Sequence, residues 1–219
     1  MAIMNGNRRK LAVVTGACSG IGLELARLCA QQGFDLVVVA DEPMIFDVAL
    51  DLGPSVTCTP VRCDLATSGG IASLMAVIAS AERAVDFLFA DAVRTLHTNI
   101  DGTVRLVFAV AGGMRSRGHG RILITGSLAG QMPESLQAVH DGSKTFLDSF
   151  AAALGNELKD TGVTVMSLIP GATQTGISEE LAAAVARIGF ERMMEANPEM
   201  VAEVANELLA APFEIRARP

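Results

Sequence analysis

Two side chains that can take part in proton transfer, His140 and Lys144, are four positions apart in the sequence. The apolar residues Leu147, Ala151 and Leu154 continue a helical period behind them, so we expect both side chains on one face of a helix. Histidine is a general acid or base near neutral pH, and a nearby ammonium lowers its pKa by disfavouring a second positive charge. The spacing indicates proton transfer. The alternative is that His140 is chemically inert.

A glycine-rich turn is the second chemical feature. It follows the apolar segment 11–14, precedes a helical pattern and reads T-G-A-C-S-G-I-G from Thr15 to Gly22. Gly16 permits a tight turn, Gly20 lets the backbone approach a pyrophosphate, and Gly22 allows close helix packing, while the helix N-terminus offers N–H groups to the anion. We therefore predict a dinucleotide site rather than a plain turn, with the binding residues Gly16, Ser19, Gly20, Ile21 and Gly22.

Asp41 ends the second apolar segment, 19 residues after Gly22. This is close to the distance at which an acidic residue meets the adenosine ribose hydroxyls. Its carboxylate and that of Glu42 would repel a 2′-phosphate, and no arginine stands at the turn or at the end of this segment in the sequence. NAD is therefore the expected cofactor and NADP the less favoured one, although an Asp after a strand is also ordinary turn chemistry.

The elements that must position these residues alternate between strands and helices. Each expected strand is almost continuously apolar, as in a parallel sheet covered on both faces. We predict a Rossmann-type, doubly wound parallel sheet of six or seven strands in three α/β/α layers, with residues 1–219 as one domain. The expected strands are 11–14, 36–40, 56–61, 87–90, 121–125 and 163–169, with a short one at 213–216; the expected helices are 21–32, 43–51, 67–81, 94–116, 136–160 and 177–211.

Composition excludes several classes of function. The net charge of -7, without a sustained Lys/Arg run, argues against nucleic acid as a partner. The four cysteines form no CxxC pair and no ligand spacing with the three histidines, so we expect no metal and a reduced, cytoplasmic environment. Apolar segments are too short to span a membrane.

The run TGxxxGIG resembles the short-chain dehydrogenase/reductase family. Residues 126–130 read G-S-L-A-G and resemble the family's serine segment, which implies that Ser127 binds the substrate oxygen. Thirteen residues after the serine the family places its catalytic tyrosine, with a lysine four residues later; this chain has His140 and Lys144 there. The resemblance implies that Lys144 holds the nicotinamide ribose, while the catalytic tyrosine is missing.

Further matches extend the resemblance on both sides of the cofactor. Asp64 and Leu65 match an Asp-Leu pair that contacts the adenine in the family. The segment beginning with Pro170 and Gly171 matches the family's segment around the nicotinamide end, and Thr175 matches its hydroxyl contact. The resemblance thus implies contacts along the whole dinucleotide.

The chain departs from the family's pattern after the fourth expected strand. Where the family usually carries Asn-Asn-Ala-Gly, residues 90–93 read A-D-A-V, so Val93 crowds the ribose or shifts the loop and Asp91 brings charge near the site. Asn99, which matches the family's proton-relay asparagine, follows after only a few residues, as if a loop and helix were deleted. The alternative for Asn99 is a solvent-facing helix position.

The resemblance implies an oxidoreductase that transfers hydride between NAD(P)(H) and a small carbonyl or alcohol substrate, with activity impaired by these departures. One alternative is a non-catalytic NAD-binding or assembly protein, and another is a chain that no longer admits the cofactor. The family often forms homodimers or homotetramers through its fourth and fifth helices. The apolar side chains that suit such contacts, or equally the core, are Val104, Val107, Phe108, Phe146 and Phe150.

Overall fold

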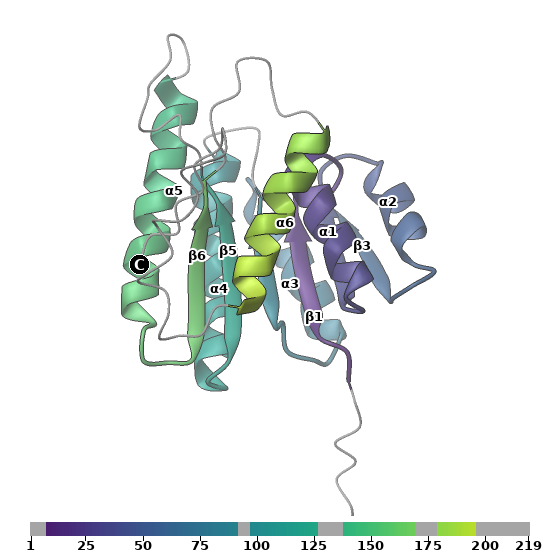
Figure 1. Ribbon diagram of the computed structural model, residues 1–219, viewed down its shortest axis with the longest axis horizontal. Coiled ribbons are helices and arrows are strands. Elements are labelled where there is room, and N and C mark those ends of the chain that lie inside the picture. Colours follow the sequence, from purple (N-terminus) through teal and green to yellow (C-terminus); the bar gives the residue numbers. More distant parts are fainter. Residues whose placement is uncertain (1–7, 92–96, 127–137, 170–178, 196–219) are drawn as a thin grey trace, which may run out of the picture.

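A computed structural model describes residues 8–91, 97–126, 138–169 and 179–195. Strands and helices alternate along these residues as the sequence predicts (Figure 1). In chain order they are β1 (Leu11–Thr15), α1 (Gly20–Gln31), β2 (Asp35–Ala40), α2 (Ile45–Leu52), β3 (Cys58–Arg62), α3 (Ser68–Ser80), β4 (Phe87–Ala90), the π-helix η1 (His97–Gly102), α4 (Thr103–Ser116), β5 (Gly120–Thr125), α5 (Ala138–Glu157), β6 (Val163–Leu168) and α6 (Glu179–Glu195).

The strands form one parallel sheet in the order β3-β2-β1-β4-β5-β6. This order confirms the predicted Rossmann-type, doubly wound sheet. The strand order reverses between β1 and β4, which are neighbours although three helices and two strands separate them in the sequence. In open sheets of this type, ligands bind outside the carboxyl ends of the strands at such a switch point.

Helices cover both faces of the sheet (Figure 1). Successive residues of a strand point to opposite faces, so Ala12 and Val14 pack with α1 and α6, whereas Leu11 and Val13 pack with α3, α4 and α5. Both faces of the central strands are therefore buried. This arrangement explains why these strands are apolar at every position and not at every second one.

Two elements differ from the sequence prediction. The predicted helix 94–116 is divided, within the described residues, into the π-helix η1 and α4. β3 is an edge strand with Thr59 and Arg62 exposed, so the expectation of coverage on both faces is wrong for β3. Among the described strands it pairs with β2 alone, which also explains why Pro60, lacking an N–H, is tolerated there. The predicted strand 213–216 and residues 196–211 lie outside the described residues.

Candidate active site

The glycine turn joins β1 to α1 at the carboxyl edge of the sheet. Gly16 and Gly20 have φ angles of +65° and +56°, a left-handed conformation that favours glycine. A Cβ at Gly22 would lie 2.4 Å from the Gly16 carbonyl oxygen, whereas a Cβ at Gly20 would meet no heavy atom within 4 Å. Gly22 is therefore required by crowding against the turn, and Gly20 by its backbone conformation in front of open space.

The N-terminus of α1 provides the donors that an anion needs. Ser19 is the N-cap residue, with an extended backbone and no side-chain capping hydrogen bond, so its hydroxyl does not occupy the helix end. Ile21 is buried, so only its backbone can face a ligand. The left-handed glycines, the open space at Gly20 and the positive end of α1 together fit a pyrophosphate.

Asp91 follows β4 and connects it to the glycine turn. The Thr15 hydroxyl donates to the Asp91 backbone oxygen at 2.8 Å, and the Gly22 N–H donates to Asp91 Oδ2 at 3.1 Å. A Cβ at Gly16 would lie 2.9 Å from the Asp91 backbone oxygen. The sequence interpretation noted only that Asp91 brings charge. It missed these contacts, and the available signal was an acidic residue directly after an apolar central strand.

Lys144 lies in α5 with 4% of its surface exposed, and its Nζ donates to the Thr125 backbone oxygen at 2.9 Å. Burial lowers the pKa of Lys144, while the charges of Asp91 and Asp148 act to raise it. The backbone of His140 belongs to the same helix, one turn earlier, as the spacing predicts. Lys144 is thus held at the carboxyl end of β5, on the same edge of the sheet as the glycine turn.

Several predicted site residues lie wholly or partly outside the described residues. The backbone of Asn99 lies in η1, which packs against α5, but the side chains of Asn99 and His140 are not described. Their proton-transfer roles stay predictions. The same holds for the residues that lie wholly outside the described ranges, namely Ser127, Pro170, Gly171, Thr175 and Val93.

The predicted adenine side lies after β2 and β3. Asp41 and Asp64 are exposed and Leu65 is half-buried. The Asp64 carboxylate accepts the Ala66 N–H at 2.8 Å, and its backbone oxygen accepts the Thr67 hydroxyl at 2.8 Å. Asp64 therefore shapes the turn that leads into α3, a structural role that the sequence interpretation did not include.

An arginine does stand at the end of β2, contrary to the sequence interpretation. The register of β2 and β3 pairs Ala40 with Arg62, and Arg62 Nε donates to the Asp41 backbone oxygen at 3.1 Å. The 21 positions between Asp41 and Arg62 concealed this proximity. Burial, followed by the charges of Glu42 and Asp41, raises the pKa of the Cys18 thiol, so both carboxylates act on the glycine turn.

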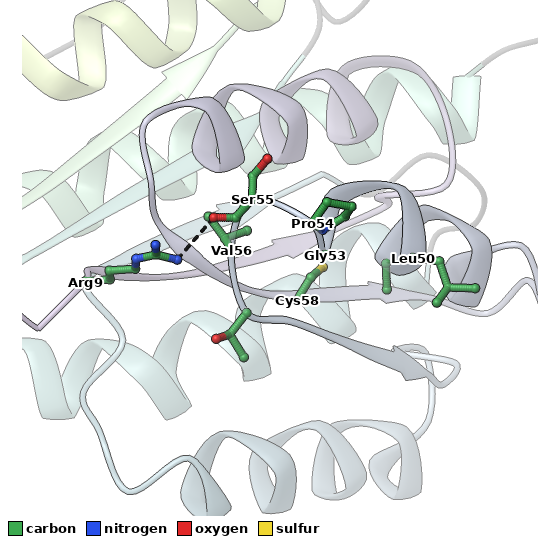
Figure 2. Close-up of a pocket in the computed structure, with 9 residues that line it drawn as sticks. Arg9, Leu50, Gly53, Pro54, Ser55, Val56 and Cys58 are labelled. Atoms are coloured by element: carbon green, nitrogen blue, oxygen red, sulfur yellow. Dashed lines mark hydrogen bonds between the residues drawn. The ribbon is translucent and has the colours of Figure 1, made fainter.

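An open groove lies elsewhere, between the end of α2 and the start of β3 (Figure 2). Arg9 closes one side by donating from Nη1 to the Ser55 backbone oxygen at 3.2 Å. Arg9 precedes β1 and Ser55 precedes β3, so the groove lies toward the amino ends of the strands, away from the glycine turn. Its lining residues are Arg9, Ala49, Leu50, Gly53, Pro54, Ser55, Val56, Thr57 and Cys58.

The described part of the chain lacks two other kinds of functional feature. Within it, no three His, Cys, Asp or Glu side chains are grouped so that they could hold a metal ion. None of its helices has the length and apolarity required to cross a bilayer.

Known proteins are similar to this chain in sequence. The model of the short chain dehydrogenase family matches residues 10–186. A protein of Streptomyces virginiae, named as the ketoacyl reductase of the monensin polyketide synthase, is 30% identical over 198 residues, or 81% of this chain and 76% of that protein. One of Streptomyces coelicolor, named as a ketoacyl reductase, is 32% identical over 186 residues, or 76% of this chain and 71% of that protein.

Solved structures resemble the chain over most of its length. A short-chain dehydrogenase from Sphingobium yanoikuyae, in complex with NADPH, superposes with a TM-score of 0.74 at 27% identity, covering 84% of this chain and 85% of that one. The region matched by the family includes the glycine turn, Asp91 and Lys144.

Proposed function

This chain belongs to the short-chain dehydrogenase family, and we propose that it transfers hydride between a nicotinamide dinucleotide and a small carbonyl or alcohol substrate. Members of the family are NAD(P)-dependent oxidoreductases that act on CH–OH and C=O groups. The observation that carries the proposal is that buried Lys144 and the glycine turn lie on the same edge of the sheet, at the carboxyl ends of β5 and β1, beside the switch point between β1 and β4. Cofactors of this kind bind at such a point in doubly wound sheets.

Each part of the site has a proposed role in the reduction of a carbonyl. The glycine turn, with Ser19 and the backbone of Ile21, binds the pyrophosphate, and Lys144 binds the nicotinamide ribose through its ammonium. Pro170, Gly171 and Thr175 enclose the nicotinamide. When bound, the reduced nicotinamide supplies the hydride that the carbonyl carbon accepts. These roles are supported by the match of this sequence to the family over residues 10–186.

Three further side chains act on the substrate oxygen in this proposal. Ser127 donates a hydrogen bond that polarises the carbonyl, His140 donates the proton that the oxygen takes up, and Asn99 organises the relay behind it. Since an imidazole is shorter than a phenol, His140 reaches the oxygen through a closely bound substrate or one bridging water. We therefore propose a lower turnover than a tyrosine at this position would give.

NAD(H) is the proposed preferred cofactor. The exposed carboxylate of Asp41 and the neighbouring Glu42 would repel a 2′-phosphate, and Asp64 and Leu65 would contact the adenine. Arg62 acts in the other direction, because its guanidinium lies against the Asp41 backbone and would attract a phosphate. The Sphingobium relative was solved with NADPH, so NADPH is the competitor against which the preference must be measured.

Ketoacyl groups are the carbonyl substrates to test first, because both Streptomyces relatives are named as ketoacyl reductases. The first experiment is a fluorescence titration with NADH and with NADPH. The chain has neither tryptophan nor tyrosine, so the protein adds little emission of its own. Saturable binding followed by oxidation of the reduced cofactor with a ketoacyl thioester supports the proposal. Binding without turnover of any carbonyl favours the non-catalytic alternative, and absence of binding refutes a cofactor site.

His140 is tested by two substitutions. Replacement by Ala should abolish carbonyl reduction while NADH still binds, and full activity of this variant would remove His140 from the mechanism. Replacement by Tyr should raise turnover if the remaining site is competent. If His140→Tyr leaves an inactive protein inactive, the departures before Asn99 are responsible instead.

A homo-oligomer is also proposed, through the outer surface of α4 and α5. Val107 belongs to the core, but Phe108 and Phe146 are 57% and 41% exposed. Both rings contact Phe150, with centroid distances of 6.0 Å. This exposed aromatic group suits a contact between two copies of the chain. Sedimentation at micromolar concentration should show a dimer or tetramer, and a monomer there would contradict the proposal.

A further inference from the structure

The carboxylate of Asp91 has no role in the reaction described so far, yet it lies among the residues that form the site. Asp91 is 4% exposed at the end of β4. The Gly22 N–H, in the first turn of α1, donates to its Oδ2 at 3.1 Å. Because the first-turn N–H groups carry the positive end of the helix dipole, a carboxylate is well matched to this donor. The side chain thus fixes the start of α1 against β4.

Thr125, at the end of β5, connects Asp91 to Lys144. The β4–β5 register places Asp91 beside Thr125, whose side chain acts to lower the pKa of the Asp91 carboxyl. The Thr125 backbone oxygen accepts Lys144 Nζ at 2.9 Å. One residue therefore lies next to both buried charges. Through it, the glycine turn, the ends of β4 and β5, and the first part of α5 form one connected group.

The two charges also act on each other directly. Burial raises the pKa of Asp91, while the Lys144 charge, Thr125 and the Gly22 N–H act to lower it. Burial likewise lowers the pKa of Lys144, while Asp91 and then Asp148 act to raise it. Burial favours the neutral form of each group, and the opposite partner favours the charged form. Removing Lys144 would take away the cation that acts on the buried Asp91, and removing Asp91 would take away the larger of the two carboxylate influences on Lys144, so either change should be destabilising.

We infer that the Asp91 carboxylate is a positioning residue that holds the glycine turn in its binding conformation and serves as the buried counter-ion of Lys144. This inference rests on the proposed dinucleotide site and adds a residue to it. In this role Asp91 acts through the Gly22 N–H and through Lys144. It fixes the pyrophosphate-binding turn and the ribose-binding lysine relative to each other, so a change at Asp91 should affect both.

The first test compares NADH affinity across three variants. Asp91→Ala removes the acceptor of the Gly22 N–H, and the loss of such a charge-assisted bond should weaken NADH binding about tenfold or more. Asp91→Asn keeps an acceptor but not the charge, so it should weaken binding by only about threefold. The matched control is Asp35→Ala. Asp35 is also buried, is hydrogen-bonded to Thr57 and paired with Arg83, but lies at the amino end of β2.

Asp35→Ala should lower the melting temperature without changing the dissociation constant for NADH. Equal effects of Asp35→Ala and Asp91→Ala on NADH binding would overturn the positioning role, because Asp91 would then act only through general stability. An unchanged affinity in Asp91→Ala would overturn it as well. A graded loss, with Asp91→Asn between the wild type and Asp91→Ala, supports the role.

The second test is a double-mutant cycle on the melting temperature with Asp91→Asn and Lys144→Met. Lys144→Met removes the cation that acts on Asp91, and Asp91→Asn removes the larger of the two carboxylate influences on Lys144, leaving Asp148. Each single substitution should lower the melting temperature by roughly 6–20 °C. The double variant carries no buried charge at this pair, so its loss should be clearly smaller than the two single losses added together. Additive losses would overturn the pairing.

The two tests separate this inference from the proposed function. If the wild type does not bind NADH at all, the proposed function fails, and so does the role of Asp91 in cofactor binding. The melting-temperature cycle needs no cofactor. A non-additive cycle would then support the Asp91–Lys144 pair by itself, and an additive one would overturn it too.

Discussion

Replacement of Gly22 by alanine is the sharpest test of the glycine turn. The new Cβ would lie 2.4 Å from the Gly16 carbonyl oxygen, 2.7 Å from the Gly16 carbonyl carbon and 2.8 Å from the Thr15 carbonyl oxygen. All three atoms belong to the backbone, so no side chain can rotate away. The turn or α1 must therefore shift, and such overpacking typically costs about 1–3 kcal/mol.

We expect the upper end of that range, about 3 kcal/mol, because three backbone contacts are violated at once. For a chain of this size the melting temperature should fall by roughly 6–12 °C, as measured by circular dichroism. NADH affinity should fall as well, since the shifted backbone is the one proposed to bind the pyrophosphate. The matched control is Gly112→Ala in α4, where the new Cβ would meet no heavy atom within 4 Å.

Alanine is the better helix former, so Gly112→Ala should raise the unfolding free energy by about 1 kcal/mol and leave NADH affinity unchanged. The comparison removes the general effect of changing glycine to alanine in a helix. If Gly22→Ala melts at the wild-type temperature and binds NADH equally well, the proposed close packing of α1 on the turn is refuted.

Three other predictions concern different parts of the molecule. Burial acts to raise the pKa of Asp35, but its bonds to Arg83 and to a backbone N–H leave this pKa below the ordinary value. The stability that Asp35 contributes is therefore present above the ordinary aspartate pKa of about 4. This stability is lost as the pH falls through the lower pKa of the folded state. Urea unfolding should therefore show that Asp35→Asn is less stable than the wild type at neutral pH, and that the difference shrinks in acid. Phe87→Ala should lower the unfolding free energy by about 3–5 kcal/mol, because Phe87 is 1% exposed. A loss below about 1 kcal/mol would contradict the place of Phe87 in the core. Asp41→Ser should improve NADPH affinity relative to NADH by about fivefold or more. Adding Arg62→Ala to this variant should reverse the gain in the same titration. If the gain survives, Arg62 does not attract the 2′-phosphate.

The sequence by itself predicts the elements closely, because their signals are local. Strand β4 is predicted and observed at the same residues, and α1 within one residue at each end. The glycine positions are also readable, since Gly16 has a left-handed backbone that favours glycine and Gly22 is crowded by the carbonyl groups of Gly16 and Thr15 in the same turn. The doubly wound parallel sheet follows from the alternation of strands and helices together with the family resemblance.

Contacts between distant segments needed the tertiary structure. Arg62 is far from Asp41 in the sequence, and only the parallel register of β2 and β3 brings them together. The exposed face of β3 depends on its place at the sheet edge. Pro60 is compatible with an edge strand, but it does not say which strand lies beside it. Register and strand neighbours arise from pairing between strands, so no local pattern encodes them.

The connection between Asp91 and Lys144 is the clearest case. The sequence presents an acidic residue after one strand and a lysine in a helix far along the chain. Reversal of the strand order between β1 and β4 brings Asp91 to the glycine turn, and the β4–β5 pairing brings Thr125 beside it. The residue types and the local elements were determined by the sequence, whereas the pairing of two buried charges was decided by the tertiary structure, because burial and distance exist only once the strands are assembled.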